Sequence, residues 1–294
     1  MRMALLGMPQ SGKKTLFTLL TGRAIPPGHN AGESLDGIAR IRDPRVDALT
    51  AICKPEKHTY AENTIVLCPD LVDDDPERKW LEPARRCEVL CILVRDFASQ
   101  NVYHTKGSVD AARDKTGIQT EFLLTDLDLV EKRLQRIEKE KRAGQSPAQA
   151  LEKKTIEKCK EALEKETMLR DVAFEPHEAA SIKSLEFLTL KPVLWSYNVD
   201  EARLGAEWRK HHHAKDGVCV VSCLIEGELA AITDMSERME FLKGLGVDSS
   251  GLDRLNATAY DAFGLMSFYT IGPDEVRAWT IRKGTLAPAA AGKV

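Results

Sequence analysis

The sequence predicts an α/β protein with a doubly wound, mostly parallel sheet and a helical insertion between two of its strands. Three observations predict it: five short apolar runs, helical stretches between them, and one long segment with a coiled-coil spacing. The runs are continuous rather than alternating, as expected of parallel strands that helices bury on both faces. Ligands of such sheets bind beyond the carboxyl ends of the strands. The five runs are Met3–Leu6, Thr64–Cys68, Val89–Val94, Pro192–Tyr197 and Val218–Cys223.

Composition limits the partners that this chain of 294 residues can take. Hydrophobic residues make up 43% and charged residues 30%, which indicates a folded core. The net charge of −3 excludes a general polyanion binder, so any nucleic-acid contact must be a local patch, and we expect no DNA sequence readout. No apolar run reaches the roughly 18 residues of a membrane-spanning helix. Seven cysteines without a CxxC motif agree with a cytoplasmic protein, and we expect no membrane partner.

The first strand leads into a glycine-rich loop with the sequence GMPQSGK, from Gly7 to Lys13. Two glycines separated by four residues, followed by lysine and an apolar helix, form the phosphate-loop pattern. Its backbone N–H groups surround a phosphate, and the lysine reaches the outer phosphates. We therefore predict nucleotide binding here. The predicted contacts are Gly7, Pro9, Gln10, Ser11, Gly12, Lys13, Lys14 and Thr15.

Lys14 departs from this pattern. A phosphate loop has Ser or Thr after its lysine, because that hydroxyl ligates Mg²⁺. A lysine cannot ligate the ion, and Thr15 lies one residue further, roughly 100° around the helix. Alternatively, the Lys14 ammonium replaces part of the charge of the metal. The sequence thus predicts nucleotide binding and leaves Mg²⁺-dependent hydrolysis open.

The long segment before the fourth strand predicts an antiparallel helical hairpin. Five apolar residues with spacings of 4, 3, 4 and 3 form a coiled-coil seam. A break follows, after which Ser146 is predicted as the N-cap of a return helix, with Pro147 first in that helix and Gln149 completing a capping box. The seam residues are Leu123, Leu127, Val130, Leu134 and Ile137, and the stripe of the return helix is Ile156, Cys159 and Leu163.

The charge of this hairpin suggests a partner. Residues 131–170 hold 12 Lys and Arg against 8 Glu, a net charge of +4, so the rest of the chain carries −7. A basic arm on an acidic body could contact RNA. The alternative is a solvated helix pair in which charges pair with residues four positions away.

Taken in order, these motifs resemble the YchF (Obg-like ATPase) subfamily of P-loop GTPase-like proteins. The resemblance covers nearly the whole chain, and the string from Val276 to Thr285 (VRAWTIRKGT) is its most specific block. It implies a GTPase-like P-loop NTPase fold with an ATPase activity, a coiled-coil arm, a C-terminal TGS domain of the β-grasp type, and a ribosome or rRNA partner reached through the arm. The other blocks are residues 7–17, 43–49, 54–57, 120–133, 191–201 and 249–255.

The resemblance also divides the chain. It implies a nucleotide-binding domain in two parts, residues 1–117 and 188–264, with the helical coiled-coil insertion at 118–187 between them. Residues 265–294 would be the incomplete start of a TGS domain, because about 30 residues cannot bury the core of a β-grasp module.

The family motif also bears on the choice of base. GTPases have Asn-Lys-x-Asp, whose aspartate accepts two hydrogen bonds from guanine, whereas the family has Asn-x-x-Glu, which suits ATP. Asn198 and Glu201 match the family form, and Val199 replaces the lysine that would lie along the base. The resemblance thus implies ATP before GTP. Ser222, Cys223 and Leu224 stand where the last base-contacting loop is expected.

Two further segments depart from the family. In switch II, Asp70 is kept, which implies a catalytic role beside Lys13 and Mg²⁺ ligation, but Asp73 replaces the glycine whose N–H contacts the γ-phosphate. The cluster Asp73–Asp75 would then place negative charge near a polyanion, or bind Mg²⁺ in compensation. Switch I (residues 31–34) lacks the expected threonine.

The predicted function is therefore purine nucleotide binding, of ATP or else GTP, with weak hydrolysis by an NTPase-type enzyme that acts as a ribosome-associated switch. The alternative is a degenerate nucleotide-binding or scaffold protein with little or no hydrolysis. A strict GTPase is a weaker third reading, which Val199 and Glu201 oppose.

Overall fold

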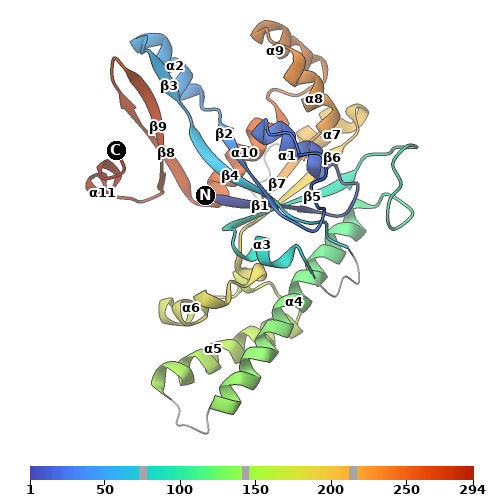
Figure 1. The fold of residues 1–294 in the computed structure, drawn as a ribbon, viewed down its shortest axis with the longest axis vertical. Coiled ribbons are helices and arrows are strands. Elements are labelled where there is room, and N and C mark those ends of the chain that lie inside the picture. The colour runs from blue at the N-terminus through green and yellow to red at the C-terminus, as the bar shows by residue number, and fades with distance from the viewer. Residues whose placement is uncertain (73–77, 141–145, 212–216) are drawn as a thin grey trace. The chain divides into compact units, whose positions relative to one another are not determined.

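The computed structural model describes residues 1–72, 78–140, 146–211 and 217–294, which form two compact units (Figure 1). The first unit joins Met1–Ala111 to Val193–Val294, and the second is Ala112–Pro192. The first contains two sheets, and the second is helical. The predicted cluster Asp73–Asp75 lies outside the described residues.

A six-stranded sheet in the order β2-β4-β1-β5-β6-β7 forms the centre of the first unit. All neighbouring strands are parallel except β2, which pairs antiparallel with β4. The predicted mostly parallel α/β sheet is confirmed, and β2 is a strand that the sequence analysis missed. The strands are β1 (Arg2–Gly7), β2 (Leu35–Ile41), β4 (Ala61–Leu67), β5 (Val89–Asp96), β6 (Val193–Val199) and β7 (Val218–Val221).

Helices cover both faces of this sheet because alternate strand residues point to opposite sides. Met3 and Leu5 of β1 share a buried cluster with Leu16 of α1 and Leu255 of α10. On β7, Val220 instead packs with helices α7 and α8. The helices of this unit are α1 (Lys13–Thr21), α2 (Pro44–Cys53), α3 (Leu81–Arg85), α7 (Glu201–His211), α8 (Cys223–Ala231), α9 (Met235–Gly244), α10 (Gly251–Ala262) and α11 (Ala287–Ala291).

A second sheet of three strands has the order β3-β9-β8. The hairpin of β8 (Leu265–Ile271) and β9 (Glu275–Arg282) takes β3 (Lys57–Thr59), from far earlier in the chain, as a parallel third strand. Val276 and Ala278 of β9 are buried against Val46 of α2. Residues 265–294 thus belong to the same compact unit as the larger sheet, and their assignment as the start of a TGS domain stays a prediction.

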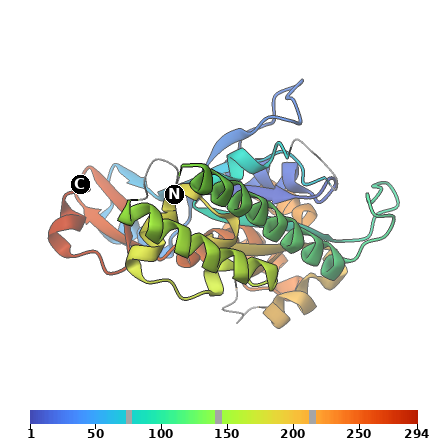
Figure 2. The same cartoon turned by 90° about the horizontal axis from the view of Figure 1, so that it is seen from below.

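The second unit is built on a helical hairpin, α4 (Ala111–Glu140) and α5 (Pro147–Glu164), which lie side by side (Figures 1 and 2). The predicted cap is confirmed: Gln149 N donates to Ser146 Oγ (3.2 Å), and Ser146 N donates to Gln149 Oε1 (3.1 Å). The short elements after α5 are η2 (Leu169–Asp171), α6 (Pro176–Ile182), η3 (Lys183–Leu185) and η4 (Leu188–Leu190). None of the helices in the described part of the chain has the length and hydrophobicity of a membrane span.

A predicted stripe of apolar residues joins the two helices of the hairpin. Val130 and Ile137 of α4 are buried in one cluster with Ile156, Cys159 and Leu163 of α5. The other seam residues, Leu123, Leu127 and Leu134, are partly buried against this cluster.

Asp126 connects α4 to the end of the second unit. Its side chain is fully buried, its Oδ1 accepts a hydrogen bond from Leu188 N (3.2 Å), and its Oδ2 accepts from the N and Oγ1 of Thr189 (2.7 Å each). Asp126→Ala should lower the free energy of unfolding by about 3 kcal/mol, because it leaves buried donors without an acceptor. Urea denaturation followed by helical circular dichroism measures this.

The matched control for this prediction is Asp128→Ala on the same helix. Asp128 is exposed and, among the described residues, pairs with Lys132 four residues on (2.7 Å), so its loss should cost about 0.5 kcal/mol or less. Equal destabilisation by the two substitutions would contradict the role given to Asp126.

Candidate functional site

The loop between β1 and α1 has the backbone that a phosphate loop needs. Gln10 and Gly12 have positive φ angles of 62° and 93°. A Cβ at Gly12 would lie 2.5 Å from Asn198 Nδ2, and a Cβ at Gly7 would lie 2.7 Å from the carbonyl oxygen of Leu93. Both positions therefore require glycine. Residues 8–15 of this loop and helix, together with Asp70, line a cavity of about 180 Å³.

Lys13 is buried beneath this loop. Its Nζ donates to the carbonyl oxygen of Cys68 (2.6 Å) and forms an ion pair with Asp70 Oδ1 (2.8 Å). Burial lowers the pKa of the Lys13 ammonium from its usual value, and the Asp70 carboxylate opposes part of that shift. The Asp70 side chain is about one-third exposed (31%), so the pair opens onto the small cavity. An incoming phosphate would therefore meet a desolvated lysine that already has an anionic partner.

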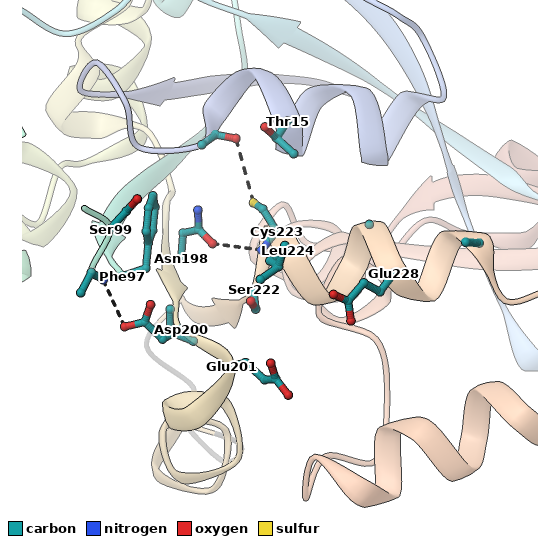
Figure 3. Close-up of a pocket in the computed structure, with 15 residues that line it drawn as sticks. Thr15, Phe97, Ser99, Asn198, Asp200, Glu201, Ser222, Cys223, Leu224 and Glu228 are labelled. Atoms are coloured by element: carbon teal, nitrogen blue, oxygen red, sulfur yellow. Dashed lines mark hydrogen bonds between the residues drawn. The ribbon is translucent and has the colours of Figure 1, made fainter. Parts of the chain in front are cut away.

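A larger cavity of about 760 Å³ lies beside the phosphate loop (Figure 3). Gly12 and Thr15 line both cavities, so the two are contiguous. Its apolar wall includes Phe97, Val199 and Leu224, and its size is within the usual range for small-molecule sites. The other lining residues are Ala98, Ser99, Asn198, Asp200, Glu201, Ser222, Cys223, Gly227, Glu228 and Ala231.

Asn198 ties together the two loops that border this cavity. It is the penultimate residue of β6 and is only 4% exposed. Its Nδ2 donates to the carbonyl oxygen of Ser11 (3.0 Å), and its Oδ1 accepts from Cys223 N (3.0 Å; Figure 3). The Cys223 thiol lies 4.0 Å from the carbonyl oxygen of Gly12, and burial raises its pKa to about 12, so it stays neutral. The Asn198 amide thus fixes the position of the phosphate loop relative to the start of α8.

Carboxylates lie on the polar side of the same cavity (Figure 3). Glu201 is the first residue of α7 and is exposed to solvent. Asp200 has a structural hydrogen bond, because its Oδ2 accepts from Ala98 N (3.1 Å) in the loop after β5. Glu228 on α8 lines the cavity from another element. Glu201 and Glu228 are therefore the carboxylates here that can face a ligand.

Of the site residues that the sequence analysis selected, all but Gly7 line one of the two cavities, and the cluster Asp73–Asp75 lies outside the described residues. The phosphate loop and Asp70 line the small cavity, and residues 198–201 and 222–224 line the large one. Their contact with a nucleotide stays a prediction. The predicted strand bounds differ from the structure, and two of the differences bear on the large cavity: β6 continues through Val199, and β7 ends at Val221. Cys223 and Leu224 consequently lie in the first turn of α8 rather than in a loop.

Sequence reasoning missed part of the large cavity. Phe97, Ala98 and Ser99 follow β5 directly, so the rule that ligands bind beyond the carboxyl ends of strands could have identified them. Gly227, Glu228 and Ala231 on α8 gave no such signal, because only the packed structure shows which face of that helix borders the cavity.

A phosphate loop that opens into an apolar cavity at the carboxyl edge of a parallel sheet defines the class of protein, a P-loop NTPase fold. Comparisons with known proteins narrow this class. The family model YchF-GTPase_C, described as a protein of unknown function (DUF933), matches residues 265–294. The ribosome-binding ATPase YchF of Escherichia coli O157:H7 is 34% identical over an alignment of 304 residues that covers 99% of this chain and 83% of that protein. The chain belongs to the YchF family.

Two further similarities agree with this assignment. The ribosome-binding ATPase YchF of Bacillus subtilis (strain 168) is 32% identical over 305 residues, covering 98% of this chain and 83% of that protein. The solved structure of the Schizosaccharomyces pombe YchF GTPase superposes with a TM-score of 0.82 at 29% identity, covering all of this chain and 83% of that one. The resemblance found in the sequence motifs is thus confirmed.

Proposed function

We propose that the protein binds a purine nucleoside triphosphate, ATP before GTP, and acts as a ribosome-associated switch with weak hydrolytic activity. The observation that carries this proposal is the pair of contiguous cavities that share Gly12 and Thr15. The small one offers backbone N–H groups, Lys13 and a helix N-terminus to phosphates. The large one offers apolar walls for a base and ribose. The names of its relatives, ribosome-binding ATPases, support the same function.

The lining of the large cavity suits a purine base, and Val199 favours ATP over GTP. Phe97, Val199 and Leu224 give a base apolar surfaces to pack against. Glu201 is an acceptor, so it can take a hydrogen bond from the exocyclic amine of adenine. Val199 provides no ammonium to lie along the base, in contrast to the lysine of the guanine-binding motif.

The proposal also includes a domain division and a location. The domain boundaries lie at 117/118, 187/188 and 264/265, and the protein works in the cytoplasm beside ribosomes.

Calorimetric titration of the purified protein with ATP and with GTP tests nucleotide binding. We expect ATP to bind at least tenfold more tightly than GTP, about 1.4 kcal/mol. Glu201→Gln should reduce that preference, because the amide presents a donor as well as an acceptor to the base. Failure to bind either nucleotide would refute the proposal, and tighter GTP binding would refute its choice of base.

Hydrolysis is the weaker half of the proposal. Lys13 would hold the outer phosphates and stabilise negative charge that develops on them, which is the main catalytic task in phosphoryl transfer. Two features favour the second candidate, a nucleotide-binding or scaffold protein with little turnover: Lys14 stands where a metal-binding hydroxyl is expected, and Asp70 is ion-paired with Lys13. Phosphate release with and without ribosomes, compared with the Lys13→Ala variant, distinguishes the two.

The helical hairpin is the proposed ribosome contact. Several of its cations pair with nearby carboxylates, as in Arg133 with Glu152 (2.7 Å) and Lys165 with Glu161 (2.6 Å). These pairs match the alternative of a solvated, self-paired hairpin. Among the described residues, however, Arg136, Lys139 and Lys154 are exposed and form no ion pair. These three are the cations best able to meet rRNA phosphates.

Reversing these three charges to glutamate should weaken co-sedimentation with ribosomes about tenfold or more. The slope of log affinity against log salt should also fall by about 2 to 3, since each phosphate contact contributes roughly 0.7 to 0.9. The control reverses three exposed lysines of the other unit, Lys210, Lys243 and Lys293, which changes net charge equally. Equal weakening by both triple variants would exclude the hairpin as a specific contact.

A further inference from the structure

Lys14 occupies a position in the phosphate cavity that bears directly on divalent-cation binding. It is the second residue of α1, exposed to solvent, and it lines the small cavity with Lys13 and Asp70. The phosphate-loop pattern places a metal-binding hydroxyl at this position. An ammonium carries three donors and no lone pair, so it cannot be a metal ligand and would repel a cation beside it.

The remaining donors do not fit a resident Mg²⁺ ion either. Mg²⁺ requires oxygen ligands in near-octahedral geometry. Asp70 is the carboxylate of this cavity, and its Oδ1 is taken up by Lys13 Nζ at 2.8 Å. Within the part of the chain that the structure describes, no three His, Cys, Asp or Glu side chains gather closely enough to hold a metal ion. The hydroxyl that would ligate Mg²⁺ is therefore missing at position 14, and the Asp70 carboxylate is ion-paired with Lys13.

Lys14, which replaces the metal-binding hydroxyl, brings a positive charge that can neutralise a triphosphate in place of a cation. Lys13 and Lys14 bring two ammonium groups to one cavity, at the N-terminus of a nine-residue helix whose dipole also favours anions. Lys13 is buried and fixed, whereas Lys14 is exposed and flexible, so its point charge can follow an oxygen of the outer phosphates.

We infer that this chain binds its nucleoside triphosphate without a divalent cation, with the Lys14 ammonium taking the place of the metal charge. The inference rests on the proposed nucleotide binding and makes it more specific. Asp70 then acts as the counter-ion of Lys13 before nucleotide binds. Its carboxylate competes with the incoming phosphates for Lys13 and is not a ligand that helps to hold them.

Calorimetry with ATP in excess Mg²⁺ and in EDTA tests the inference. We expect the dissociation constants of the unaltered protein in the two buffers to agree within about threefold. Lys14→Ser, which restores the hydroxyl, should bind ATP about tenfold more weakly in EDTA, because a charge-assisted contact is lost. It should recover affinity when Mg²⁺ is added. Lys243→Ser, at an exposed lysine outside both cavities, is the matched control and should change neither value.

Asp70→Asn gives a second test whose sign separates the two models. If Asp70 only neutralises Lys13, its amide variant should bind ATP several-fold more tightly in both buffers, since a competing anion is removed. If Asp70 ligates Mg²⁺, the variant should bind more weakly in Mg²⁺. Weaker binding there, or ATP binding by the unaltered protein that requires Mg²⁺, would overturn this inference alone. No ATP binding in either buffer would overturn it together with the proposed function.

Discussion

Replacing Lys13 by alanine is expected to weaken ATP binding about 100-fold, or roughly 3 kcal/mol. The Lys13 ammonium is 3% exposed and points to the end of β4, where Cys68 and Asp70 receive it. A phosphate in the small cavity would meet the same group in a desolvated setting, where a charge-assisted hydrogen bond is strong. Calorimetric titration with ATP measures the loss.

The fold should survive this substitution, because burying an ammonium is itself costly and alanine removes that cost along with the ion pair. Circular dichroism and thermal unfolding of Lys13→Ala should therefore stay close to those of the unaltered protein. Lys243→Ala, at an exposed lysine of α9, is the control and should leave ATP affinity unchanged. Retention of full ATP affinity by Lys13→Ala would remove the glycine-rich loop from the binding site.

Removing the Asn198 side chain should have the largest combined effect on stability and on binding. Asn198→Ala leaves the carbonyl oxygen of Ser11 and the N–H group of Cys223 without their partner. We expect the free energy of unfolding to fall by about 3 kcal/mol, since each buried unsatisfied group costs roughly 1–3 kcal/mol. ATP affinity should fall at least tenfold, because the phosphate loop and α8 lose the contact that fixes their relative position.

Asn198→Asp tests the role of the amide donor of Asn198 separately. The carboxylate keeps an acceptor for Cys223 N–H, but it turns an acceptor toward the Ser11 carbonyl, where the amide had a donor. Near neutral pH this variant should be no more stable than Asn198→Ala. Its free energy of unfolding should rise as the pH is lowered and the new carboxyl becomes protonated. Asn101→Ala, at an exposed asparagine of the same unit, is the control. Wild-type stability of Asn198→Asp at neutral pH would refute the bridging role.

The strands that could be predicted from sequence are those buried on both faces. In β5, residues 89–94 are all buried, so the chain shows an uninterrupted apolar run. Strand β2 gave the opposite signal, because its buried positions include the small residues Gly37 and Ala39 while Ile38 is 58% exposed. Strand β3 consists of Lys57, His58 and Thr59, which carry no apolar pattern; its pairing with β9 alone makes it a strand.

The candidate site also has a part that the sequence could predict and a part that it could not. The phosphate loop is contiguous in sequence, so its glycines and Lys13 identified it directly. The large cavity is assembled from residues 97–99, 198–201 and 222–231, and only the packed sheet brings these segments together. The family motif located Asn198 and Glu201. Its spacing could not show that the Asn198 amide donates one hydrogen bond to Ser11 and accepts another from Cys223.

The three-stranded sheet also sets an order of events during synthesis. Thr59 of β3 contacts Glu275 of β9 across 216 residues of chain, so β3 must wait until nearly all of the polypeptide has emerged. The β8–β9 hairpin joins residues that are close in sequence and can form by itself, whereas adding β3 requires closure of a very long loop. Docking of β3 is therefore expected among the last steps of folding, and until then the free edge of β9 is open to pairing with other chains.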